Sequence, residues 1–183
     1  MKNNEDVDTV TLQRARRGNE AAYRALYSQY KQYVWALAWR MSDGDRETAA
    51  EIMQRGFIAA FKALRTYKGT SAFSTWLYRI VYNAALDFIR TRRRIADRER
   101  VFDERIAAAA GGDATENRDF VKKILTGLSP TERFVLTGRE VTGLSYEELA
   151  VVTGKEEGAL RTMVHRIKER IRAHWQTEYA YGG

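Results

Sequence analysis

The chain has 183 residues, of which 44% are hydrophobic, and 31 lysines and arginines against 24 acidic residues give it a formal charge of +7. This length fits two small domains, and the basic charge favours an acidic partner such as nucleic acid or an anionic membrane. The absence of cysteine excludes disulfides, thiolate metal sites and cysteine nucleophiles. No apolar run approaches the roughly 20 residues of a membrane helix and the N-terminus has no apolar signal core, so we expect a cytoplasmic protein without membrane insertion.

Helical periodicity dominates the first part of the chain and predicts an all-α fold. Asn19 is a suitable N-cap for a first helix, which Ser42-Asp43-Gly44 should end. Two further apolar stripes run through residues 49–64 and 76–88. Three helices of this kind can bury one another's apolar faces, which predicts a small helical domain.

Beyond Arg94 the periodicity fades into charge and then into AAAAGGDATEN, whose small residues and paired glycines predict a flexible connection. The chain should therefore consist of two small helical domains joined by a flexible linker. The predicted division is a first domain at residues 1–94, a linker at 95–119, a second domain at 120–179 and a tail at 180–183.

Capping boxes mark two helices of the second domain. Ser129 and Ser145 are each followed three residues later by a glutamate, Glu132 and Glu148. Gly154 then ends the short helix that begins after Ser145, and a longer helix follows. Two helices joined by a short turn that contains glycine are typical of a helix-turn-helix.

The second helix of this predicted helix-turn-helix is strongly basic, as a helix between the phosphate rows of a major groove must be. Its first residues are placed for base edges and its later cations for phosphates. A helical packing module with a solvated basic face is the alternative. The residues that we expect at duplex DNA are Arg161, Thr162, His165, Arg166 and Lys168.

Two blocks of the sequence resemble bacterial extracytoplasmic-function sigma factors. YKGTSAFSTWLYRIVYNAALDFIRTRRR is similar to their promoter-melting segment, and LSPTERFVLTGREVTGLSYEELAVVTGKEEGALRTMVHRIKERIRAHW is similar to their second conserved domain. The resemblance implies a specificity subunit of RNA polymerase that is not an enzyme. Its first domain would bind the polymerase clamp and open the minus-ten element, and its second would read the minus-thirty-five element.

The partners implied by the resemblance are RNA polymerase core, through the clamp of the largest subunit and the flap of the second-largest, and promoter DNA, both duplex and single-stranded. In that family an anti-sigma protein often clamps both domains in the inactive state, which makes it a further candidate partner. The resemblance implies no cofactor and no metal.

The resemblance also implies a polymerase contact on the segment EIMQRGF, residues 51–57. Arg55 departs from the family, which normally has Glu there, and Gly56 inside a helix costs about 1 kcal/mol relative to Ala. In the second domain Glu156 replaces the usual Ser cap, and Met163 stands where the family often has Arg. The expected polymerase-binding residues are Glu51, Ile52, Gln54, Arg55 and Phe57.

The resemblance implies that a loop at residues 68–71 would hold a flipped base of the minus-ten element. Extruding a base costs a few kcal/mol, and stacking on a protein ring returns roughly 1–3 kcal/mol per base, so the two nearly cancel. The domain should therefore capture an opened strand and need the polymerase to open it. For the arginines of this set a solvated helix end is the alternative. The expected minus-ten residues are Lys68, Gly69, Thr70, Ser71, Arg79, Asn83, Arg90, Arg92 and Arg93.

In the same segment Trp76, Ile80 and Ala84 share one stripe and are expected mainly in the core, while Phe73 and Tyr78 fit either the core or DNA. Two other functions compete with the sigma factor. A free-standing helix-turn-helix regulator would use its first domain to bind a ligand or to dimerise. A nucleic-acid-processing enzyme has little support, because the two histidines lie nine residues apart on a basic helix and no carboxylate cluster has metal-ligand spacing.

Overall fold

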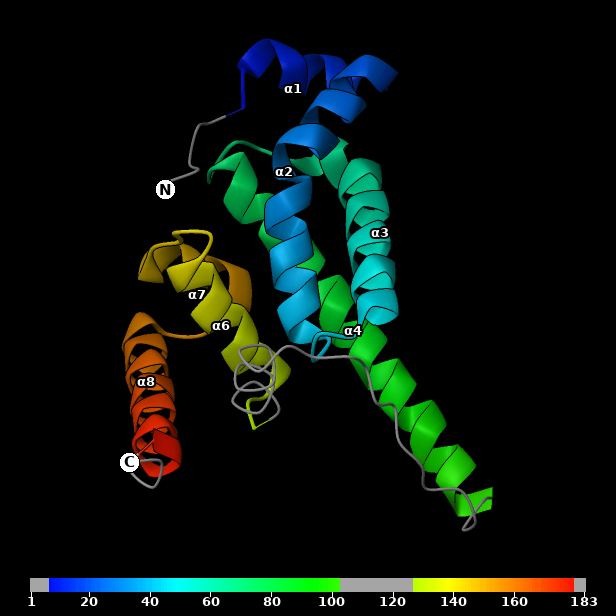
Figure 1. The fold of residues 1–183 in the computed structure, drawn as a ribbon. Coiled ribbons are helices and arrows are strands. Elements are labelled where there is room, and N and C mark those ends of the chain that lie inside the picture. The colour runs from blue at the N-terminus through cyan, green and yellow to red at the C-terminus, as the bar shows by residue number, and fades with distance from the viewer. Residues whose placement is uncertain (1–6, 103–126, 180–183) are drawn as a thin grey trace.

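The computed structural model describes residues 7–102 and 127–179, and these residues form helices without any strand (Figure 1). The predicted all-α class is confirmed. The first half contains α1 (Thr9–Arg16), α2 (Glu20–Met41), α3 (Arg46–Ala63), the 3-10 turn η1 (Leu64–Thr66) and α4 (Phe73–Phe102). The second half contains α6 (Pro130–Glu140), α7 (Tyr146–Thr153) and α8 (Glu157–Tyr179).

The predicted helix ends are confirmed where local capping sets them. The Asn19 side chain accepts a hydrogen bond from the Ala22 amide at 2.9 Å and so caps α2. Ser129 and Ser145 both form complete capping boxes. Gly154 ends α7 in the left-handed conformation at φ 70°, which costs glycine little because it has no Cβ. These signals act within a few residues, so the sequence alone reveals them.

Two helical segments were not predicted. Helix α1 begins at an N-cap, Asp8, whose carboxylate accepts hydrogen bonds from the amides of Val10 and Thr11. Helix α4 continues to Phe102, past the predicted domain end at Arg94. Residues 95–102 contain neither glycine nor proline, and charged residues such as Arg and Glu are good helix formers, so their charge did not end the helix. Residues 103–119 of the predicted linker and the predicted tail at 180–183 lie outside the described residues.

The first half has its core between α2, α3 and α4. Leu26, Leu37, Ile52 and Leu77 are almost fully buried there. An added Cβ on Gly56 would lie only 2.9 Å from Cγ2 of Val81, so glycine permits α3 and α4 to approach closely at this point. The glycine that appears unfavourable in the helical sequence is therefore explained by packing.

The aromatic residues at the start of α4 belong mainly to this core. Phe73 and Tyr78 are each 2% exposed, which assigns both to the core. Phe73 packs against Tyr30, with ring centroids 5.5 Å apart, and Trp76 is half-buried against Tyr67 at 5.3 Å. Packing in the core therefore explains the presence of Phe73 and Tyr78, the two rings whose role the sequence left open.

In the second half, α7 and α8 form the predicted helix-turn-helix on α6. Leu149, Leu160 and Val164 are buried between these helices, and Ala150 is half-buried. An added Cβ on Gly138 would lie 2.8 Å from Cδ2 of Leu149, which shows how closely α6 and α7 pack.

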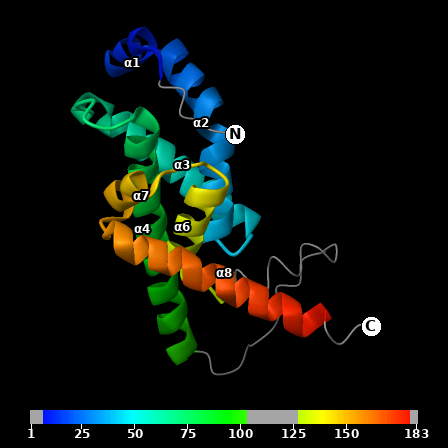
Figure 2. The same ribbon diagram turned by 90° about the vertical axis from the view of Figure 1, so that its left-hand side faces the viewer.

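The two halves also pack against each other, which the sequence did not predict. Helix α6 contacts α2, and α7 contacts α4 (Figures 1 and 2). The rings of Tyr82 on α4 and Phe134 on α6 lie 4.6 Å apart, and the Tyr82 hydroxyl shares a hydrogen bond with Thr131 at 2.9 Å. Arg133 of α6 is only 4% exposed and forms an ion pair with Asp43 in the turn after α2. The structure therefore shows a closed arrangement with one continuous apolar core.

Candidate nucleic-acid and polymerase interfaces

Helix α8 presents an exposed basic face. Arg161 lies over the ring of Tyr146 at 4.5 Å and forms an ion pair with Glu157 at 3.3 Å. Lys168 pairs with Glu140 at 2.8 Å. Exposed pairs of this kind contribute about 0–1 kcal/mol, so a phosphate can compete for either cation. All five predicted duplex-DNA residues are exposed: Arg161, Thr162, His165, Arg166 and Lys168.

The loop at residues 68–71 is held on an aromatic support. Lys68, Gly69 and Thr70 are exposed and Ser71 is half-buried. The hydroxyl of buried Tyr67 donates a hydrogen bond to the Ser71 carbonyl at 2.7 Å. Because the Tyr67 ring is itself packed in the core, the loop is fixed relative to α4.

The arginines of α4 divide between two faces. Arg79, Asn83 and Arg90 are exposed, and their spacing of four and seven residues places them on one side of the helix. Arg92 instead donates to the Thr48 hydroxyl of α3 and lies 3.9 Å from the Asp45 carboxylate. The structure thus brings three predicted minus-ten residues together and directs Arg92 to the start of α3. The remaining one, Arg93, is exposed.

The predicted polymerase-binding segment is only partly exposed. Ile52 and Phe57 are buried in the core, where their side chains support α3 from inside. Gln54 is exposed, and Arg55 forms an ion pair with half-buried Glu51 at 2.5 Å. The Arg55 guanidinium also lies 4.8 Å from the centre of the Phe88 ring on α4. Arg55 therefore connects α3 to α4 in addition to being available to a partner.

Other apolar side chains of this half are exposed or half-buried at positions for which the sequence predicted no partner contact. Ile58 on α3 is 46% exposed. Trp35 and Trp39 on α2 are half-buried, with ring centroids 5.9 Å apart. The spacing of four residues between the two tryptophans, which places them on one side of α2, is visible in the sequence. The apolar stripe of the same helix makes this pair hard to distinguish from core residues.

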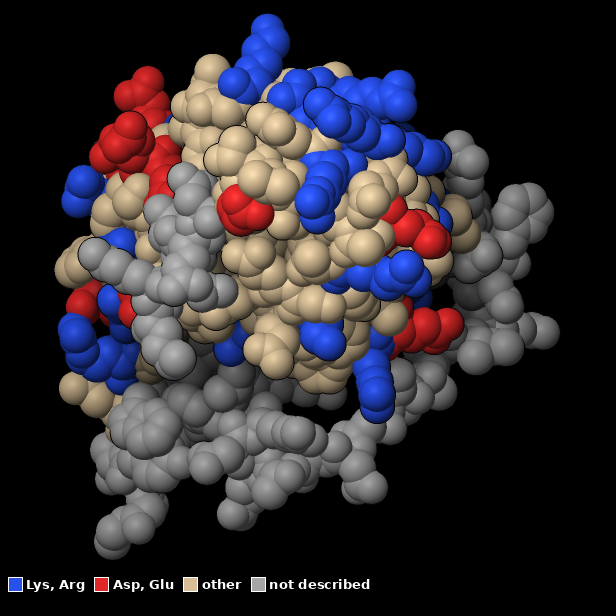
Figure 3. All heavy atoms as spheres, turned by 90° about the horizontal axis from the view of Figure 1, so that it is seen from above, with Lys and Arg blue, Asp and Glu red and all other residues tan. Residues whose placement is uncertain are grey.

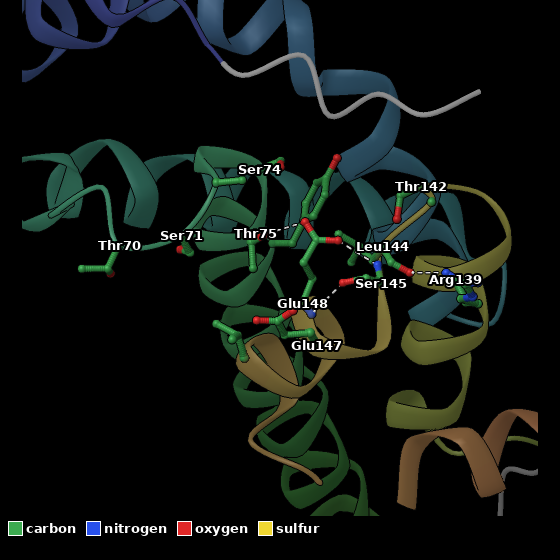
Figure 4. Close-up of a pocket in the computed structure, with 14 residues that line it drawn as sticks. Thr70, Ser71, Ser74, Thr75, Arg139, Thr142, Leu144, Ser145, Glu147 and Glu148 are labelled. Carbon is green, nitrogen blue, oxygen red and sulfur yellow. Dashed lines mark hydrogen bonds between the residues drawn. The ribbon is translucent and has the colours of Figure 1, made fainter. Parts of the chain in front are cut away.

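A pocket of about 670 Å³ lies between the two halves (Figure 4). Thr70, Ser71 and Thr75 line it from the first half, and Ser145 and Glu148 line it from the second. The Thr75 hydroxyl donates to Glu148 at 3.1 Å across the boundary. In the closed arrangement the loop at residues 68–71 therefore faces the start of α7.

The pocket is lined by several hydroxyl side chains, together with the charged residues Arg139, Glu147 and Glu148. Its wall includes Tyr78, and burial raises the pKa of this phenol, so that it stays protonated near neutral pH. Within the described ranges no group of three or more His, Asp or Glu side chains could hold a metal ion.

No helix in the described part of the chain combines the length and apolar character needed to cross a membrane.

Family models match both halves of the chain. A model of sigma-70 region 2 matches residues 26–95, and a model of sigma-70 region 4 matches residues 121–171. The chain is 30% identical over 179 residues to the ECF RNA polymerase sigma-E factor of Escherichia coli (strain K12), covering 90% of this chain and 92% of that protein. It is 31% identical over 98 residues to the sigma-E factor of Haemophilus influenzae, covering 54% of this chain and 51% of that one.

Two solved structures share the fold. CnrH in complex with the cytosolic domain of CnrY has a TM-score of 0.70 and 24% identity, over 94% of this chain and 99% of that chain. The sigma factor RpoE in complex with the anti-sigma factor NepR from Bartonella quintana has a TM-score of 0.67 and 25% identity, over 82% of this chain and 94% of that chain.

These matches and the two helical halves define a sigma-70-type initiation factor, a class that binds RNA polymerase and DNA without being catalytic. Within that class, the chain belongs to the ECF family of sigma factors and acts in promoter-directed transcription.

Proposed function

We propose that this sigma factor divides promoter recognition between its halves, with residues 1–94 capturing the opened minus-ten element and residues 120–179 reading the minus-thirty-five element. One observation supports the proposal: a single chain presents two exposed polar surfaces, on α8 and on α4, and each has side chains suited to nucleic acid. The basic face of α8 suits a major groove. The loop at residues 68–71, followed by Arg79 and Asn83 on one exposed side of α4, suits a single strand, since an Asn side chain can hydrogen-bond to a base edge.

Binding of both promoter elements at once then requires the halves to separate. Two promoter elements about two helical turns apart lie roughly 70 Å from each other. About 25 extended residues reach up to roughly 80 Å, so the chain between the halves is long enough. In the closed arrangement the loop at residues 68–71 faces α7 across the pocket. We infer that this arrangement is inactive and that RNA polymerase core binds the open one.

The proposed polymerase contact uses the exposed side of α3, with Gln54 and Arg55 at its centre. The related RpoE structure contains the anti-sigma factor NepR, and we propose that an anti-sigma protein also regulates this chain. Arg55→Glu should strengthen binding to a typical polymerase clamp, because it restores the charge that the family normally has there. Weaker binding of the variant would mean that Arg55 meets an adapted partner.

The test is run-off transcription with RNA polymerase core and this chain on a genomic promoter library. The proposal predicts initiation at defined promoters with core and weak binding to duplex DNA without it. Arg79→Ala with Asn83→Ala should reduce strand opening while binding to a minus-thirty-five duplex is kept, because α8 is unchanged. Tight, specific duplex binding by the isolated chain, with no initiation in the presence of core, would support the free-standing regulator instead.

A further inference from the structure

The end of the molecule that carries α1 is strongly basic. Figure 3 views this end directly, and lysine and arginine side chains gather over part of it. No ion pair within the described residues engages these exposed side chains, although the carboxylate of Asp8, which caps α1, lies near enough to Arg14 for the two charges to interact. The cations of this α1 surface are Arg14, Arg17, Lys62, Arg65 and Lys68.

A folded scaffold holds the α1 surface in place. Ala15 of α1 is fully buried, and Leu12 packs against the core. The Arg16 guanidinium donates a hydrogen bond to the Arg65 carbonyl at 3.3 Å, which ties α1 to η1. Because α1 and η1 contact each other, exposed cations from separate parts of the sequence lie at the same end of the molecule.

The α1 surface continues the line of the proposed minus-ten site. Along α4 the exposed residues run from Arg90 through Asn83 to Arg79, and the loop at residues 68–71 precedes that helix. Arg65 lies three residues before Lys68, within about 10 Å along an extended chain. A strand that follows α4 to the loop would next meet η1 and α1 (Figure 1).

We propose that the α1 surface binds the sugar-phosphate backbone of the single strand immediately beyond the base held by the loop, an inference that rests on the proposed function. Contacts from these cations to phosphates neutralise charge and carry no sequence information directly. The surface therefore adds affinity and salt dependence to the opened complex and leaves the choice of promoter to the other two sites.

The test compares two double variants that remove the same charge. Arg17→Gln with Arg65→Gln changes the α1 surface and keeps the backbone carbonyl that Arg16 contacts. Lys31→Gln with Arg46→Gln is the matched control, because both residues are exposed and belong to α2 and α3 outside this surface. Thermal unfolding of each chain checks that the fold is kept.

The assay measures binding of assembled holoenzyme to fork DNA from a promoter found in the run-off experiment, with the single strand either ending at the captured base or extending six nucleotides beyond it. The wild type and the control should gain affinity from the extension. The α1-surface variant should lose that gain, and its slope of log affinity against log salt should fall by about 1.4, because each single-strand phosphate contact contributes roughly 0.7.

An unchanged slope, an equal loss in the control, or an equal loss on the short fork would overturn the inference. Binding of the free chain to vesicles of phosphatidylglycerol that the α1-surface variant abolishes, with DNA binding unaffected, would assign the surface to a membrane and also overturn it. Failure of the wild-type holoenzyme to initiate anywhere would reject the proposed function itself. Normal initiation with no effect of the variant would reject only the role of the α1 surface.

Discussion

The close contact between Gly56 and Val81 leads to a quantitative prediction for Gly56→Ala. In an open helix this change stabilises by about 1 kcal/mol, because glycine loses more backbone freedom on folding. Here the added Cβ would lie 2.9 Å from Cγ2 of Val81 and 3.4 Å from its Cα. Val81 is fully buried, and a β-branched side chain has little freedom to rotate away. Overpacking of this kind costs about 1–3 kcal/mol, so the net change should be a loss of about 0–2 kcal/mol.

A double-mutant cycle separates the clash from helix propensity. Val81→Ala removes the methyl group that the new Cβ would strike, although it destabilises the core on its own. In that background Gly56→Ala should stabilise by up to about 1 kcal/mol, which gives a coupling energy of about 1–3 kcal/mol between neighbouring sites. Gly158→Ala serves as a control, because an added Cβ there has nothing within 4 Å.

The measurement is thermal and urea unfolding followed by circular dichroism. In a chain of this size 1 kcal/mol corresponds to a shift in Tm of about 2–4 °C. If Gly56→Ala raises the Tm in the wild-type background as much as in the Val81→Ala background, the two helices do not depend on this glycine and the packing explanation is wrong.

Three further predictions concern the closed arrangement and two helix caps. Asp43→Asn should weaken the ion pair with buried Arg133 by about 1 kcal/mol, since Asp43 is itself half-exposed. The weaker pair should lower energy transfer between dyes placed on single engineered cysteines in the two halves. Unchanged transfer would show that the pair does not hold the halves together. Ser145→Ala should cost about 1 kcal/mol in unfolding by removing the cap of α7, whereas Ser145→Thr should keep most of it. Hydrogen bonds from Thr48 hold the pKa of Asp45 below its ordinary value, so the contribution of Asp45 to stability is present above about pH 4 and is lost as the pH falls further. The free energy of unfolding of Asp45→Asn should therefore depend less on pH between about pH 5 and 3 than that of the wild type. An identical pH dependence of the two would contradict this.

The parts of the fold that depend on neighbours in sequence could be predicted. The caps at Asn19, Ser129 and Ser145 each use a side chain and an amide three residues away, so their signal is complete in the sequence. The packing of α6 on α2 had no such signal. Arg133 in particular looks like a surface residue of an exposed helix, and its ion pair with Asp43, in a turn distant in the sequence, helps to compensate its burial.

The candidate sites divide in the same way. The exposure of the basic face of α8 could be predicted from its charge, because lysine and arginine side chains are rarely buried in a core unless they are paired. The face of α3 could not be assigned from residue type, since apolar side chains such as Ile52 and Phe57 suit a core and a protein interface equally well. For Arg92 the deciding fact was the packing of α4 beside Thr48 at the start of α3, and helical spacing alone could not supply it.

On the proposed function, we infer that the closed arrangement limits promoter binding through spacing more than through covering the candidate DNA-binding residues. The face of α8 and the exposed side of α4 both remain accessible while α6 packs on α2. Contacts such as Tyr82 with Phe134 fix the two halves side by side, whereas the promoter elements that they are proposed to bind lie roughly 70 Å apart. A closed chain could therefore engage one element at a time, with the affinity of a single site. Separating the halves would allow both to bind together, and the second contact would then form at the high effective concentration that a tether provides. We propose that RNA polymerase core stabilises the open form, and that it thereby controls promoter recognition without altering either candidate DNA-binding face.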